Sequence, residues 1–200
     1  MNNVIRQISL WDGFGAEYTT MTIEAAVKRA VKLNVSHIVV ASTSGNTAVQ
    51  LDDAINEAYI QTEFKRPELC CVTHSFGFAE NGKDEMSSVM RTKLTSRGVK
   101  VLTTTHLMGG IDRAVGTKFS GLYPAGIVAQ TLKMYGQGTK VAIECATMCL
   151  DAGFIPYGED IIAIGGSQTG CDTAILFRPA NAMRFFDGKI REIICKPRDF

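Results

Sequence analysis

The 200-residue chain is 46% hydrophobic, and its 21 basic and 20 acidic residues leave a net charge of +1. This length predicts one domain over residues 1–200, and the near-neutral charge without a basic run argues against a nucleic-acid partner. No apolar stretch is long enough to span a bilayer and the N-terminus lacks a signal-peptide core, so we expect a cytoplasmic protein with no membrane partner.

Helices and strands alternate in the first half of the chain. Apolar residues at helical spacing predict a helix that ends near Leu33, with Thr20 or Thr22 as its N-cap. The apolar run His37–Ala41 predicts a buried parallel strand, and residues 47–59 predict the helix that follows it. Further along we expect a strand at 69–73, a helix at 86–97 that stops at Gly98, and a strand at 99–104.

The alternation loosens in the second half. Helices are expected at about 109–115, 124–135 and 139–152. The strand predicted at 160–164 is joined to that at 173–177 by too few residues for a helical crossover, so the two should be antiparallel. Residues 190–195 predict a final edge strand. The pattern indicates one α/β domain with a mostly parallel sheet.

The chain contains six cysteines but no CxxC motif. Cys70 and Cys71 should point to opposite faces of a strand, and Cys145 and Cys149 should share a helix face. Buried free thiols are the interpretation we favour for a cytosolic protein, with disulfides or a metal site as the alternatives.

Four segments follow the carboxyl ends of predicted strands, where ligands bind in open parallel sheets. They are Ser42–Asn46, His74–Glu80, Thr105–Gly110 and Gly165–Cys171. If the sheet is as predicted, these four loops line one crevice.

The first loop has the composition of a phosphate site. Hydroxyls and a glycine stand where a strand feeds a helix, and the first N–H groups of a helix lack intrahelical acceptors. The predicted contacts are Ser42, Thr43, Ser44, Gly45, Asn46 and Thr47. The alternative is that these residues only cap the helix and form the turn.

The other loops supply further candidate contacts. Gly165 and Gly166 would let a ligand approach the backbone closely, with Ser167 beside them, although the segment could simply be a hairpin link. His74 and His106 both follow strand ends, and each could contact the ligand, act as acid or base, or bond a neighbouring carbonyl.

Several polar and aromatic side chains have roles that the sequence leaves open. The two histidines could hold a metal with Asp84, Asp112 or Asp172, but no metal-binding spacing supports this and we expect no metal. The carboxylate of Glu144, on an apolar helix, either bonds a loop N–H or faces outward. Four aromatic residues could stack on a planar ring or fill the core, namely Phe76, Phe78, Phe119 and Tyr123.

Two segments resemble the C-terminal domain of pyruvate kinase. Residues 39–48 are similar to its strand-loop-helix of pattern T-x-S-G-x-S-A, and residues 160–177 to its last hairpin with the glycine-rich effector loop. In pyruvate kinases these loops hold a sugar bisphosphate. The resemblance implies a three-layer α/β/α fold with a mostly parallel sheet and an antiparallel final strand.

The whole chain is more similar still to the stand-alone pyruvate kinase alpha/beta domain proteins of archaea and bacteria. The matching stretches include residues 37–45, 72–74, 121–124, 152–160 and 191–197. The catalytic barrel of pyruvate kinase has no counterpart here, so phosphoenolpyruvate chemistry is not expected. The resemblance names flavin mononucleotide as a ligand for such a protein.

One departure from pyruvate kinase bears on the ligand. Thr43 and Asn46 stand where pyruvate kinases often carry Lys and Arg. Without fixed cations, phosphate binding at this loop depends on N–H groups, hydroxyls and the helix dipole. Such a site suits a ligand with one phosphate monoester and an attached ring that becomes buried, rather than a bisphosphate.

These observations predict a protein that binds a small phosphorylated planar molecule, with flavin mononucleotide as the candidate cofactor. The first alternative is an enzyme, flavin-dependent or acting on a phosphorylated metabolite, that uses His74 or His106 for proton transfer. The second is a regulatory or assembly module without turnover, and the oligomeric state, a homo-oligomer included, stays open.

Overall fold

The computed structural model describes residues 5–60 and 62–200. Seven strands form one sheet in the order β1-β7-β6-β5-β2-β3-β4. They are β1 (Ser9–Trp11), β2 (His37–Ala41), β3 (Glu68–Val72), β4 (Lys100–Leu102), β5 (Ile161–Gly165), β6 (Thr173–Arg178) and β7 (Lys189–Pro197). Strands β5, β2, β3 and β4 pair in parallel, whereas β6 is antiparallel to both β5 and β7. The mostly parallel sheet with its antiparallel hairpin is confirmed.

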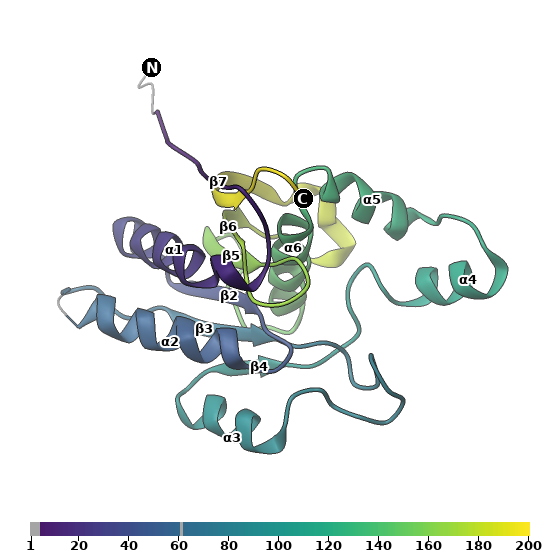
Figure 1. Ribbon diagram of the computed structural model, residues 1–200, viewed down its shortest axis with the longest axis horizontal. Coiled ribbons are helices and arrows are strands. Elements are labelled where there is room, and N and C mark those ends of the chain that lie inside the picture. Colours follow the sequence, from purple (N-terminus) through teal and green to yellow (C-terminus); the bar gives the residue numbers. More distant parts are fainter. Residues whose placement is uncertain (1–4, 61) are drawn as a thin grey trace.

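Helices cover both faces of the sheet, which gives three layers. They are α1 (Thr19–Leu33), α2 (Asn46–Tyr59), α3 (Ser88–Ser96), α4 (Ile111–Phe119), α5 (Pro124–Lys133) and α6 (Gln137–Asp151), with the short 3-10 helices η1 (Ala16–Tyr18) and η2 (Ala182–Asp187). Helices α1 and α2 lie on one side of the sheet and α6 on the other, while α4 and α5 project beyond α6 (Figure 1).

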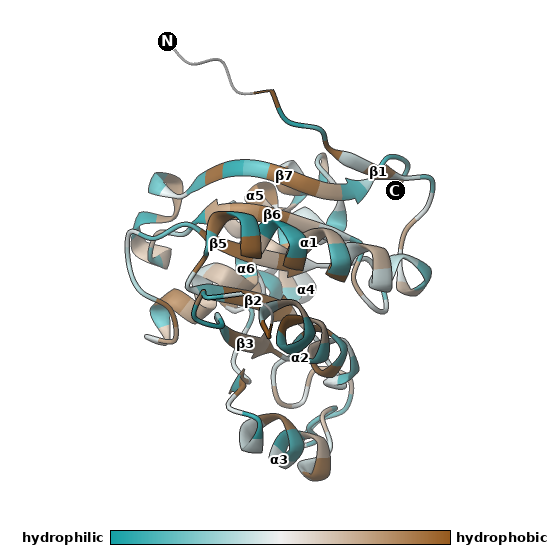
Figure 2. Ribbon diagram, turned by 90° about the vertical axis from the view of Figure 1, so that its left-hand side faces the viewer, coloured by the Kyte–Doolittle hydropathy of each residue, from teal (hydrophilic) through white to brown (hydrophobic). Residues whose placement is uncertain are grey.

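The central strands are apolar because both of their faces are buried. Val40 packs among residues of α1 and α2, whereas its neighbour Val39 packs against α6. Cys71 and Cys70 divide between the same two clusters, as the alternation of side chains along a strand requires. Figure 2 shows hydrophobic residues concentrated on these strands. Continuous apolar runs such as β2 are typical of strands covered on both faces.

All six cysteines are buried free thiols, as predicted. Burial raises the pKa of Cys71 to about 12 and that of Cys195 to about 12. A thiol with so high a pKa stays protonated near neutral pH and is a poor nucleophile. These two side chains therefore serve as packing groups.

The β1–β7 pairing and the N-cap of α1 differ from the sequence-based expectations. Strand β1 was not predicted, and because it pairs in parallel with β7, that last strand is not at the edge of the sheet. Tyr18 is the N-cap of α1, so Thr20 and Thr22 lie inside the helix and do not cap it. Within residues 5–60 and 62–200, no helix combines the length and apolar character needed to cross a membrane.

Candidate functional site

The carboxyl ends of β5, β2, β3 and β4 meet at one edge of the sheet. The N–H of Ser42 donates to the carbonyl oxygen of Val72 at 2.9 Å, and the N–H of Thr73 donates to that of Leu102 at 2.9 Å. The loops after β2, β3 and β4 therefore leave the sheet side by side, and the loop after β5 joins them because β5 pairs in parallel with β2. The four loops thus leave one edge of the sheet, as predicted, and their lining of one crevice stays a prediction.

Within residues 5–60 and 62–200, two backbone donors at the start of α2 have no protein acceptor. Gly45 precedes the helix with a φ of 90°, which glycine adopts without steric cost, and no side chain caps the helix. Among the described residues, nothing accepts from the N–H groups of Thr47 and Ala48, and the N–H of Asn46 makes only a long 3.5 Å contact to Ser44 Oγ. Ser44 and Asn46 are exposed, whereas Gly45, Thr47 and Ala48 are buried, so of these three amides that of Asn46 stands at an exposed position.

Helix α3 covers the other side of this turn. A Cβ atom at Gly45 would lie 2.5 Å from Cγ of Met90, so only glycine fits beneath that side chain. Arg97 at the end of α3 donates to the buried carboxylate of Asp52 on α2, with Nε 2.5 Å from Oδ2. Helix α3 thereby fixes the position of α2.

Asp172 holds the loop after β5. The residue is fully buried, and its carboxylate accepts from the N–H of Gly15 at 3.0 Å, the N–H of Ser167 at 2.9 Å and the hydroxyl of Thr173 at 2.7 Å. Trp11 Nε1–H donates to the backbone carbonyl of Asp172 at 2.9 Å. Because protein donors occupy its oxygens, Asp172 has a structural role. The buried Ser167 Oγ, in contrast, has no hydrogen-bond partner in the described part of the chain.

The glycines of this loop are explained by packing. A Cβ atom at Gly165 would collide with the carbonyl oxygen of Gly138 and lie 2.8 Å from the N atom of Ala142, both on α6. A Cβ at Gly166 would lie 2.5 Å from the carbonyl oxygen of Gly170. The close approach that these glycines permit is therefore made by protein backbone, and their contact with a ligand stays a prediction.

Three rings cluster where the loops after β3 and β4 meet. His74 and Phe78 have ring centroids 4.1 Å apart, and His106 lies 5.5 Å from His74 and 5.4 Å from Phe78. His74 Nδ1 is 2.8 Å from the carboxylate of Glu85. The guanidinium of Arg113 lies 5.9 Å from the Phe78 ring, and Phe78 is 43% exposed. Phe78 is therefore no core residue, and its ring is available for stacking.

Glu144 links this cluster to α6. Its buried carboxylate accepts from the N–H of Met108 at 2.7 Å and pairs with Lys140 one turn earlier. Of the two roles left open by the sequence, bonding to a loop N–H is the one observed. Burial lowers the pKa of His106 below its ordinary 6.5, although the charge of Glu144 opposes the shift. The His106 imidazole is therefore neutral at pH 7.

Residues 20–176, from the first turn of α1 into β6, match the family model of the pyruvate kinase, alpha/beta domain. The chain belongs to this family. The resemblance read from the strand-loop-helix and hairpin segments is thereby confirmed. The assignment accounts for the fold and for the loops at the sheet edge, and it names no ligand.

In this pyruvate kinase alpha/beta domain, the predicted ligand contacts occupy three neighbouring loops. Ser42, Thr43, Ser44, Gly45, Asn46 and Thr47 precede or begin α2, His74 follows β3, and Gly165, Gly166 and Ser167 end or follow β5. In the first loop Ser44 and Asn46 are exposed, Thr43 is half-buried, and Ser42 and Thr47 are buried. The exposed part of the loop is thus the part beside the free amides.

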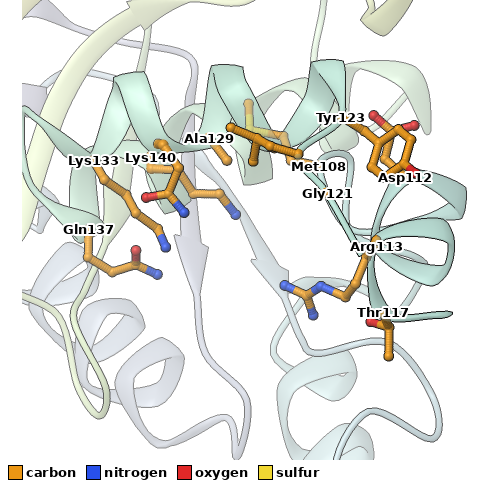
Figure 3. A pocket seen from close by; sticks show the side chains of 14 residues that line it. Met108, Asp112, Arg113, Thr117, Gly121, Tyr123, Ala129, Lys133, Gln137 and Lys140 are labelled. Carbon is orange, nitrogen blue, oxygen red and sulfur yellow. The ribbon is translucent and has the colours of Figure 1, made fainter. Parts of the chain in front are cut away.

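The domain also contains a cavity of about 340 Å³ between α4, α5 and α6 (Figure 3). Its three cationic lining residues, Arg113, Lys133 and Lys140, are absent from the predicted site. These three residues belong to separate helices, and in the sequence each is typical of a solvent-exposed helix face. Helical spacing gave no signal for the cavity, because Lys133 ends α5 whereas Gln137 and Lys140 belong to α6, beyond the break at Gly136.

Proposed function

We propose that this chain binds a phosphorylated planar ligand at the carboxyl edge of its sheet, with flavin mononucleotide as the first ligand to test. The observation that carries the proposal is the pair of amides of Thr47 and Ala48, which lack an acceptor within the described residues beside the exposed Ser44 and Asn46. A phosphate there gains charge-assisted hydrogen bonds and the helix dipole, which contributes about 0.3–1 kcal/mol and up to about 2 kcal/mol when partly buried.

The ring of such a ligand has a stacking partner at the same edge. Phe78 is 43% exposed and lies against His74 and His106 on the loops that neighbour the one preceding α2. Aromatic pairs of this kind contribute roughly 0.5–1.5 kcal/mol beyond the area that they bury. The partnerless Ser167 Oγ is a further buried group that a ligand hydroxyl can satisfy.

The residues present suit flavin mononucleotide better than a sugar bisphosphate. The segment from Ser42 to Thr47 contains no Lys or Arg, so it offers neutral donors to one phosphate rather than fixed cations to two. When bound, a flavin supplies hydride and electron-transfer chemistry. The chain itself contributes the amides that hold the phosphate and the aromatic surface that orients the ring.

Parallel titrations with flavin mononucleotide and riboflavin, followed by flavin fluorescence, test this proposal. Riboflavin lacks only the phosphate, so we expect it to bind roughly tenfold or more weakly. Phe78→Leu should weaken both ligands, whereas Phe64→Leu, at a 48% exposed phenylalanine between α2 and β3, should weaken neither. Equal affinity for the two flavins, or no binding of either, would contradict the proposal.

The histidine pair supports a second candidate function, general acid–base catalysis on the bound ligand. A carboxylate at His74 Nδ1, as Glu85 provides at 2.8 Å, fixes the tautomer that leaves Nε2 free to accept a proton. A turnover screen of phosphorylated metabolites should then show activity that His74→Ala and His106→Ala reduce without loss of ligand binding. Unchanged turnover in both variants would exclude these residues as the acid and base.

A further inference from the structure

We infer that the cavity between α4, α5 and α6 is a second anion site, which takes a small phosphate ester independently of the site at α2. Figure 3 shows Lys133, Gln137 and Lys140 entering this cavity from one side and Arg113 from the other. Residues 42–47 and 165–167 do not line it. The inference therefore does not rest on the proposed function.

The charges around the cavity are unbalanced in favour of an anion. Asp112, the acidic residue in the lining, already accepts a hydrogen bond from the N–H of Ala125 at 2.8 Å. The carboxylate of the neighbouring Glu144 accepts from the N–H of Met108 and pairs with Lys140. Over the described residues, Arg113 and Lys133 form no ion pair. Two cations directed into one concavity focus a positive potential there.

The geometry selects phosphate among small anions. A carboxylate presents two oxygens in one plane, whereas a phosphate monoester presents three terminal oxygens that accept from donors on opposite sides. Arg113 and Lys133 provide such opposed donors (Figure 3). The remaining polar lining includes Gln130 and Gln137, which suit the hydroxyls of a small polar ester. At about 340 Å³ the cavity is near the lower limit of ligand pockets, roughly 300–1,000 Å³.

Calorimetric titration of the full chain with inorganic phosphate and with glycerol 3-phosphate tests the inference. The titrations use an Asn46→Asp background, which places a carboxylate at the start of α2 and so removes anion binding there. Combining Arg113→Gln with Lys133→Gln should weaken both probes about tenfold or more. The control is Lys118→Gln, which also removes one positive charge from α4 but at a side chain that lies over the Phe119 ring and does not line the cavity. This variant should leave both affinities within about twofold of the background.

The outcomes separate this inference from the proposed function. Equal phosphate affinity with and without Arg113 and Lys133 would overturn it, as would absence of binding in the Asn46→Asp background. Failure of the proposed function would instead appear as unaltered flavin binding in Asn46→Asp. A double variant that keeps the circular dichroism and unfolding midpoint of its background, yet loses both probes, would establish the site.

Discussion

Replacing Asp172 with alanine tests how the loop after β5 is held. The carboxylate is fully buried and accepts from two backbone N–H groups, of Gly15 and Ser167, and from the hydroxyl of Thr173. A buried donor without an acceptor costs about 1–3 kcal/mol, and the Thr173 hydroxyl can rotate to another partner. Two amides left without an acceptor therefore predict a loss of about 2–6 kcal/mol in the free energy of unfolding for Asp172→Ala.

Asparagine at the same position isolates the hydrogen-bond contribution. Both amides donate to Oδ2, at 3.0 and 2.9 Å, and the oxygen of an asparagine amide can occupy that place. Its NH₂ then faces the Thr173 hydroxyl, which can accept instead of donate. Asp172→Asn should therefore cost only about 1 kcal/mol, the difference between charged and neutral acceptors.

Urea unfolding followed by circular dichroism and by fluorescence of the chain's single tryptophan measures both variants. Trp11 donates to the backbone carbonyl of residue 172, so its environment reports on this region even when the side chain is removed. Equal losses for the two substitutions, or a loss below about 1 kcal/mol for alanine, would refute the account of Asp172 as a hydrogen-bonded clamp.

Three further predictions follow from contacts around the site. Gly165→Ala should destabilise the domain by about 1–3 kcal/mol or more in urea unfolding, because its Cβ would meet the backbone of Gly138, and a neutral result would show that α6 can shift. Glu144→Ala should cost about 1–3 kcal/mol because Met108 N–H loses its acceptor, whereas Glu144→Gln should cost less, and the reverse order would contradict this. The lowered pKa of His106 means that the unfolded chain binds the proton more tightly, so stability should fall as the pH drops below about 6.5. His106→Asn should reduce that fall in unfolding curves measured from about pH 7 to about pH 5.5, and an identical pH profile would exclude this residue.

The parts of the fold that were predictable are those specified by local sequence. The strand His37–Ala41 was located with its observed bounds, because a continuous apolar run between polar segments has few other interpretations. The antiparallel pairing of β5 with β6 followed from the short link between them. The placement of the loops at one edge followed in turn from the parallel order of the strands.

The features that the sequence did not predict depend on contacts between distant segments of the chain. Strand β1 has three residues and is held by pairing with Cys195 and its neighbours at the far end of the chain, which no local pattern shows. The packing of Gly165 against the backbone of α6 is another such contact, and the contact of this glycine with a ligand stays a prediction. The cationic cavity combines Arg113 with Lys133 and Lys140 from three helices, whose relative placement comes only from tertiary packing.

The central claim is that free amides at the start of α2 hold a phosphate, and Asn46→Asp tests it most directly. A carboxylate at this exposed position interacts favourably with the helix dipole and stabilises α2 by about 0.3–1 kcal/mol. Weaker binding in this variant would therefore not result from a less stable helix. Gln50→Glu makes the same amide-to-carboxylate change one turn further along α2, also at an exposed position. We predict that fluorescence titration gives a dissociation constant for flavin mononucleotide roughly tenfold or more higher in Asn46→Asp and within about twofold of wild type in Gln50→Glu. Equal affinity in the two variants would contradict the claim.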